Sequence, residues 1–148
     1  MTDKNSADVY LTDLSPDTLE RVANGDAGPE TSGTILHVHV FLSPEAGKTP
    51  IERTAASATA RLVVLARGHA GVYDGAGFLM PGRSLRKGRA SGTLRHAPTR
   101  LTRRTAGFED LLGASTMRVT FGSRADEPTS DLIARAMRVA VAGTDPVE

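Results

Sequence analysis

The chain has 148 residues, a formal net charge of +1, and neither cysteine nor tryptophan. This length is typical of one domain that can fold without disulfides or metals, so we expect a single domain over residues 1–148. The absence of cysteine excludes disulfides, thiolate metal sites and cysteine nucleophiles. The first residues are polar and acidic, and no apolar run approaches the roughly 20 residues of a membrane helix. We therefore expect a cytoplasmic protein with no signal peptide and no membrane partner.

The first 33 residues predict a short strand, a helix and a loop. Residues 9–11, Val-Tyr-Leu, are typical of a strand. Ser15 and Pro16 indicate a helix start, because serine can cap free amides and proline at the first helical position loses no hydrogen bond. Asn24 and Gly25 indicate the helix end. The turn-rich residues 25–33 then predict a loop.

Residues 35–42 give the clearest strand pattern in the chain. Alternation places two sets of side chains on opposite faces: Leu36, Val38, Val40 and Leu42 on one, and Ile35, His37, His39 and Phe41 on the other. Both sets are largely apolar. The pattern therefore predicts a central strand that is covered on both sides.

Residues 50–67 predict a second helix. Thr49 and Glu52 form a capping box, with Pro50 at the first helical position. Gly68 provides the helix end. Apolar side chains recur between these limits at helical spacing, namely Ile51, Ala55, Ala58, Leu62 and Leu65.

The second half predicts three strands and a final helix. Residues 71–80 read as a strand bent near Gly75 and Gly77, and residues 93–103 as a strand interrupted near Pro98. Residues 108–112 suggest a helical turn, and residues 117–121 a half-buried strand. The last helix can be capped by Asp126, Thr129 or Ser130 and ends at Gly143. The element order predicts an α+β fold, a single-domain sandwich of a mixed sheet with helices packed on it.

The middle of the chain resembles a group of uncharacterised bacterial α+β domains, in which a strand, an Ala-rich helix and a Gly-Val-Tyr strand follow one another. The matching segments are HVHVFLS, TPIERTAASATARLVVLARG and GVYDGAGFLMP. The resemblance implies a non-catalytic role, regulatory or immunity-like. It carries over no functional residue.

Charge is segregated along the chain. Residues 1–30 carry seven acids and two bases, whereas residues 75–108 carry eight bases and no acid. Because arginine matches phosphate and carboxylate groups, the basic segment 83–104 predicts contact with an acidic protein surface or another polyanion. The alternative is a solvated face that pairs with the acidic N-terminal segment. The predicted partner-binding residues are Arg83, Arg86, Lys87, Arg89, Arg95, Arg100, Arg103 and Arg104.

Two weaker patterns suggest ligands. His37 and His39 lie on one face of their strand, and such a pair can share a metal ion, with Glu45 and His96 as further ligands. We nevertheless predict no bound metal and no cofactor, because neighbouring histidines are common without one. Residues 43–49 end like a phosphate-binding loop, but Leu42 stands where that loop needs glycine.

The sequence thus favours a non-enzymatic binding, regulatory or assembly protein that contacts an acidic partner through residues 83–104. The alternative is a metal-dependent enzyme with a site formed by His37, His39 and His96.

Overall fold

The structure is a computed structural model, which describes residues 7–40, 57–81 and 89–147. Its elements in chain order are β1 (Ala7–Thr12), α1 (Pro16–Ala23), β2 (Gly33–Val40), β3 (Ala58–Ala66), β4 (His69–Pro81), β5 (Arg89–Arg104), β6 (Ser115–Arg124), α2 (Glu127–Ala142) and β7 (Asp145–Pro146). No helix within these described ranges has the length and apolar character needed to cross a membrane.

The strands form one sheet in which β1 to β6 lie side by side in chain order, and β7 pairs with β5. Every pairing is antiparallel. The predicted α+β sandwich on a mixed sheet is therefore wrong, because the fold is dominated by a purely antiparallel sheet. Short turns are enough to join antiparallel strands, and residues 58–66, which were predicted to be helical, form one of these strands.

The error lies in β3. This strand pairs along its whole length with β2 and β4, so its continuous apolar run is that of a central strand and not of a helix. A tight turn joins it to β4. Both turn residues have positive φ, 48° at Arg67 and 79° at Gly68, which is characteristic of the two-residue hairpin turn. Gly68 therefore turns a hairpin instead of ending a helix. Residues 50–56 lie outside the described residues.

Several local predictions are confirmed. The Ser15 hydroxyl accepts a hydrogen bond from the amide of Thr18 (3.2 Å), and Asp126 caps α2 in the same way by accepting from the amide of Thr129 (3.1 Å). Strands occur as expected at β1, β2, β4, β5 and β6. The helical turn predicted at residues 108–112 is wrong. This segment is a loop that inserts the buried ring of Phe108 against Gly71.

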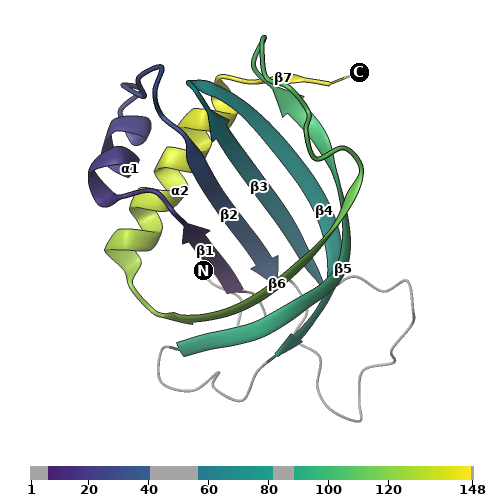
Figure 1. Cartoon of the computed structure of the whole chain (residues 1–148). Coiled ribbons are helices and arrows are strands. Elements are labelled where there is room, and N and C mark those ends of the chain that lie inside the picture. The colour runs from purple at the N-terminus through teal and green to yellow at the C-terminus, as the bar shows by residue number, and fades with distance from the viewer. Residues whose placement is uncertain (1–6, 41–56, 82–88, 148) are drawn as a thin grey trace.

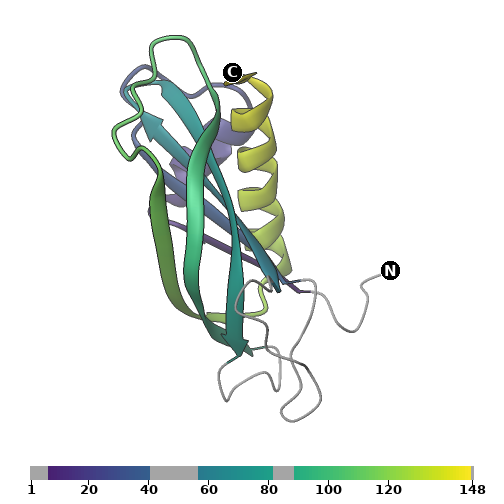
Figure 2. The same ribbon diagram turned by 90° about the vertical axis from the view of Figure 1, so that its right-hand side faces the viewer.

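The sheet is strongly curved, and each of its faces builds a separate core. Figure 1 shows β5 and β6 curving round so that β6 passes across one face, while Figure 2 shows α2 on the opposite face. The inner core beneath β5 and β6 contains Val9, Val38, Val40, Ala58, Ala60, Leu79, Leu94, Ala97 and Phe121. The outer core beneath α1 and α2 contains Leu19, Val22, Ile35, Val63, Leu65, Val72, Ile133, Ala136 and Met137, among others.

The curvature depends on a close approach of β5 to β4. A Cβ added at Gly75 would lie 2.4 Å from the carbonyl oxygen of Pro98, so only glycine fits there. The β4–β5 register shifts between Gly75 and Phe78, which confirms the predicted bend. The β5–β6 register also shifts, between Leu94 and Ala97.

Candidate functional site

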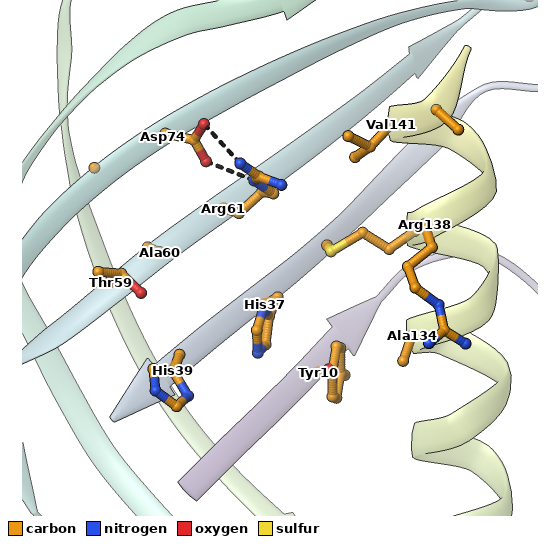
Figure 3. Close-up of a pocket in the computed structure, with 13 residues that line it drawn as sticks. Tyr10, His37, His39, Thr59, Ala60, Arg61, Asp74, Ala134, Arg138 and Val141 are labelled. Atoms are coloured by element: carbon orange, nitrogen blue, oxygen red, sulfur yellow. Dashed lines mark hydrogen bonds and ion pairs between the residues drawn. The ribbon is translucent and has the colours of Figure 1, made fainter. Parts of the chain in front are cut away.

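A groove lies between α2 and the outer face of the sheet (Figure 3), with a volume of about 800 Å³. Strands β1 to β4 form its floor, and α2 forms one wall. The wall is largely apolar, with Ala134, Met137, Val141 and Ala142 facing the groove, together with Arg138.

The strand register explains why the floor is polar. One row of directly paired residues crosses four strands in the order Tyr10, His37, Arg61 and Asp74. The adjacent row contains Asp8, His39, Thr59 and Ala76. Paired residues in an antiparallel sheet point to the same face, so both rows face the groove side. The next row towards the hairpin turns is apolar, with Ile35, Val63 and Val72 buried in the outer core.

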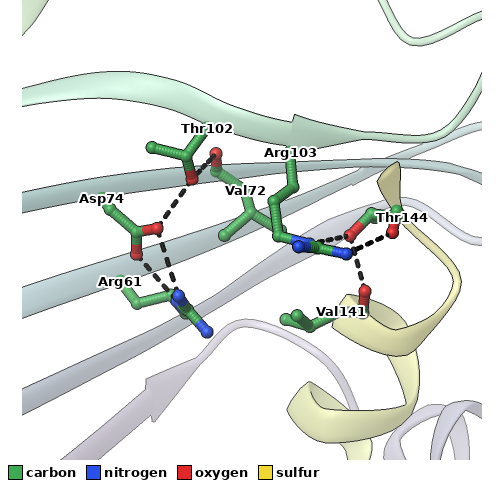
Figure 4. Close-up of polar contacts among 7 residues, drawn as sticks. All are labelled: Arg61, Val72, Asp74, Thr102, Arg103, Val141 and Thr144. Carbon is green, nitrogen blue, oxygen red and sulfur yellow. Dashed lines mark hydrogen bonds and ion pairs between the residues drawn. The ribbon is translucent and has the colours of Figure 1, made fainter. Parts of the chain in front are cut away.

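An ion pair holds the far end of the first row. The Arg61 guanidinium donates from Nε to Oδ1 of Asp74 (2.7 Å) and from Nη2 to Oδ2 (3.2 Å). Figure 4 shows that Thr102 of β5 also donates to Asp74, at 2.7 Å. Burial raises the pKa of Asp74, but these hydrogen bonds and the positive charge of Arg61 outweigh it and lower the pKa overall. The pair therefore stays ionised near neutral pH and fixes Arg61 in place.

A second polar cluster occupies the other end of the floor. Oδ1 of Asp8 lies 2.8 Å from Nε2 of His37 and 2.8 Å from Nδ1 of His39. The pKa of this carboxyl is lowered, because the two imidazole contacts outweigh the opposing effect of its burial. The Tyr10 ring stacks on His37, with centroids 4.5 Å apart and planes 7° from parallel. This stacking fixes the orientation of the His37 imidazole.

Arg138 is the cation that α2 contributes. Within the described part of the chain its side chain is exposed and forms no hydrogen bond or ion pair with another residue. It lies close enough to Tyr10 for its charge to lower the pKa of the phenol, although burial and the charge of Asp8 raise that pKa overall. Figure 3 places its guanidinium beside the groove, across from Tyr10 and His37.

Sequence reasoning found only part of this constellation. It correctly placed His37 and His39 on one face, and the structure brings them together. His96, the third ligand of the metal hypothesis, is exposed at a bulge in β5 and belongs neither to the groove nor to the histidine cluster. The third member of the cluster is instead Asp8, which sequence reasoning did not identify. The alternation of Asp8 and Tyr10 around buried Val9 was the available signal, but strand pairing had to be known to use it.

The structure describes the side chains of four of the eight predicted partner-binding residues. The Arg103 guanidinium is held by intramolecular hydrogen bonds at the end of α2 (Figure 4). Its Nε donates to the hydroxyl of Thr144 (3.1 Å), and its Nη2 donates to the carbonyl of Thr144 (2.7 Å). Arg104 is exposed and contacts the carbonyl of Phe108 at 3.5 Å. Arg95 and Arg100 are also exposed. Arg89 is in β5, whereas Arg83, Arg86 and Lys87 lie outside the described residues, as does the loop at 43–49.

The alternative reading of the basic segment was a solvated face that pairs with the acidic N-terminal segment. Between residues 7–30 and residues 91–104, whose side chains the structure describes, no ion pair is formed. Asp8 instead contacts the two histidines, and Asp13 accepts a hydrogen bond from the amide of Thr34 at 2.7 Å.

Comparisons with protein-family models, with curated proteins and with solved structures found no match for this chain.

Proposed function

We propose that this protein is a binding protein whose groove between α2 and the sheet takes a small amphipathic anion. The volume of about 800 Å³ falls within the range of roughly 300–1,000 Å³ that is typical of small-molecule sites. Ligand sites are commonly apolar clefts with a few polar groups that orient the ligand. Here α2 offers the apolar wall, and the sheet offers the polar floor.

The observation that carries the proposal is that two cations from different elements line the same groove. Arg138 comes from the wall and Arg61 from the floor. Asp74 occupies one edge of the Arg61 guanidinium and fixes it, while Arg138 keeps its donors free of partners in the described structure. Arginine forks bind carboxylates and phosphates through paired hydrogen bonds. In the proposed complex, the anionic head of the ligand binds these cations and its apolar tail packs against Met137 and Val141.

Octanoate is a suitable probe, with octanol and octylamine as matched ligands that lack the negative charge. We expect octanoate alone to bind, and to shift the backbone NMR signals of α2 and of β1 to β4. Arg138→Met keeps the apolar stem and removes the charge, so octanoate affinity should fall about tenfold, as for the loss of one charged hydrogen bond. Arg118→Met is the control, because Arg118 is exposed on β6 outside the groove. Equal binding of all three probes, or equal affinity of both variants, would contradict the proposal.

A second candidate is the sequence-based one, contact with an acidic partner through exposed arginines. It is favoured by a specific observation, since β5 and β6 contain seven arginines and no acid. Arg95, Arg100, Arg118 and Arg124 are exposed, and Arg124 pairs with the position of Arg89. The contact between α2 and β1 is more extensive than any contact that either helix makes with β5 or β6.

A salt titration of heparin and nucleic acid binding tests this candidate. Affinity should fall as salt rises, because phosphate or sulfate contacts release counterions. Arg95→Ala, Arg118→Ala and Arg124→Ala in combination should abolish the binding, whereas Arg135→Ala on α2 should leave it unchanged. Absence of binding by the parent protein at low salt would dismiss the candidate.

A further inference from the structure

In place of the sequence-based expectation of no bound metal, we propose that Asp8, His37 and His39 form a binding site for a divalent first-row transition-metal ion. Two imidazoles and one carboxylate are a recognised ligand set for such ions, and this set leaves coordination positions open for other ligands. The inference concerns the metal alone and does not depend on the identity of any groove ligand.

The distances fit a shared ion. Oδ1 of Asp8 lies 2.8 Å from one nitrogen of each histidine, and one ligand atom from each of the three residues falls within 4.8 Å of the others. Metal bonds to imidazole nitrogen and carboxylate oxygen are about 2.0–2.1 Å long. Two ligands on one ion are therefore about 2.9 Å apart at right angles, and about 3.3 Å apart at the tetrahedral angle that Zn²⁺ adopts. The two separations from Asp8 are therefore close to those of adjacent ligands on one ion, and the histidine nitrogens lie within 4.8 Å of each other.

The strand pairing holds the three side chains in this arrangement. Asp8 and His39 are direct partners on β1 and β2, and His37 is one pair further along the same face. The stacked ring of Tyr10 restrains His37. A site built on two paired strands loses little conformational entropy when the metal binds, because its ligands are already positioned.

The competing explanation is a metal-free cluster, in which a carboxylate accepts hydrogen bonds from two histidines. Both arrangements bring the same atoms together. They differ in one measurable property, because only a metal site retains a stoichiometric ion and releases it when any one of the three ligands is removed.

The experiment is equilibrium dialysis of the chelator-treated full chain against Zn²⁺, and separately against Co²⁺, with the bound metal quantified. We expect one ion per chain. Asp8→Asn, His37→Ala and His39→Ala should each weaken binding by at least about tenfold, since even supporting residues of metal sites have effects of this size. Asp8→Asn preserves the side-chain shape, which keeps the test valid where an alanine variant does not fold.

His96→Asn is the matched control. This residue has a positive φ of 50°, which asparagine tolerates, and it lies outside the cluster, so its replacement should leave metal affinity unchanged. The proposal is overturned when the parent chain retains no ion at micromolar metal, when the Asp8 and histidine variants bind as tightly as the parent, or when His96→Asn loses the metal.

Discussion

Leu94→Ala tests the feature of the fold that sequence patterns did not predict, the closure of β5 over the inner core. Leu94 is 0% exposed and packs in the cluster that contains Val38 of β2 and Phe121 of β6. Truncating a fully buried leucine removes its transfer free energy and leaves a cavity, which together cost about 2–5 kcal/mol. Because domains are typically stable by only about 5–15 kcal/mol, this is a large fraction of the total.

Urea unfolding followed by far-ultraviolet circular dichroism measures this effect, since the chain has no tryptophan. Leu111→Ala is the matched control, because Leu111 is 84% exposed and should change the free energy of unfolding by less than about 0.5 kcal/mol. Leu94→Val, with an expected loss of about 1 kcal/mol, keeps the comparison possible where the alanine variant is largely unfolded. A loss for Leu94→Ala no larger than that of the control would refute the packing of β5 across the sheet.

Two further predictions concern polar groups. Burial, and then the hydrogen bond to Asp110, raise the pKa of Tyr73 to about 12, so the stability that this shift contributes is complete below pH 10 and is lost as the pH rises through 12. Ultraviolet titration of the Tyr10→Phe variant, in which Tyr73 is the remaining tyrosine, measures this pKa, and adding Asp110→Asn should lower it. An ordinary tyrosine pKa in Tyr10→Phe would contradict the prediction. Arg103→Met breaks two hydrogen bonds to the end of α2 and should lower the free energy of unfolding by about 1–3 kcal/mol, whereas the same change at exposed Arg118 should not. Equal urea midpoints for these two variants would show that Arg103 does not anchor α2.

The correct sequence predictions are those that depend on local interactions. The caps at Ser15 and Asp126 involve side chains three residues from the amides they bind. The alternation around Val38 reports which side chains share a face of one strand. These interactions form between residues a few positions apart, so they do not depend on how the rest of the chain folds.

The wrong predictions concern segments whose local sequence is compatible with both a helix and a strand, so that strand pairing decides which one forms. Residues 58–66 have helix-like spacing and alanine content, but hydrogen bonds to β2 and β4 on both sides make them a strand. Once this segment is a strand, the hairpin at Gly68 makes its connection to β4 antiparallel. Tertiary context overrides helix propensity here, because propensities differ by well under about 1 kcal/mol per residue for most residues.

The same division applies to the candidate sites. The sequence by itself determined that His37 and His39 share a face and that β5 carries bases without acids, because both are properties of one segment. Only the tertiary structure decided that Asp8 contacts the histidines, that Arg138 and Arg61 line the same groove, and that Arg103 binds the end of α2. Each of these relations joins residues far apart in the chain, and such contacts depend on strand register and helix docking, which no local pattern specifies.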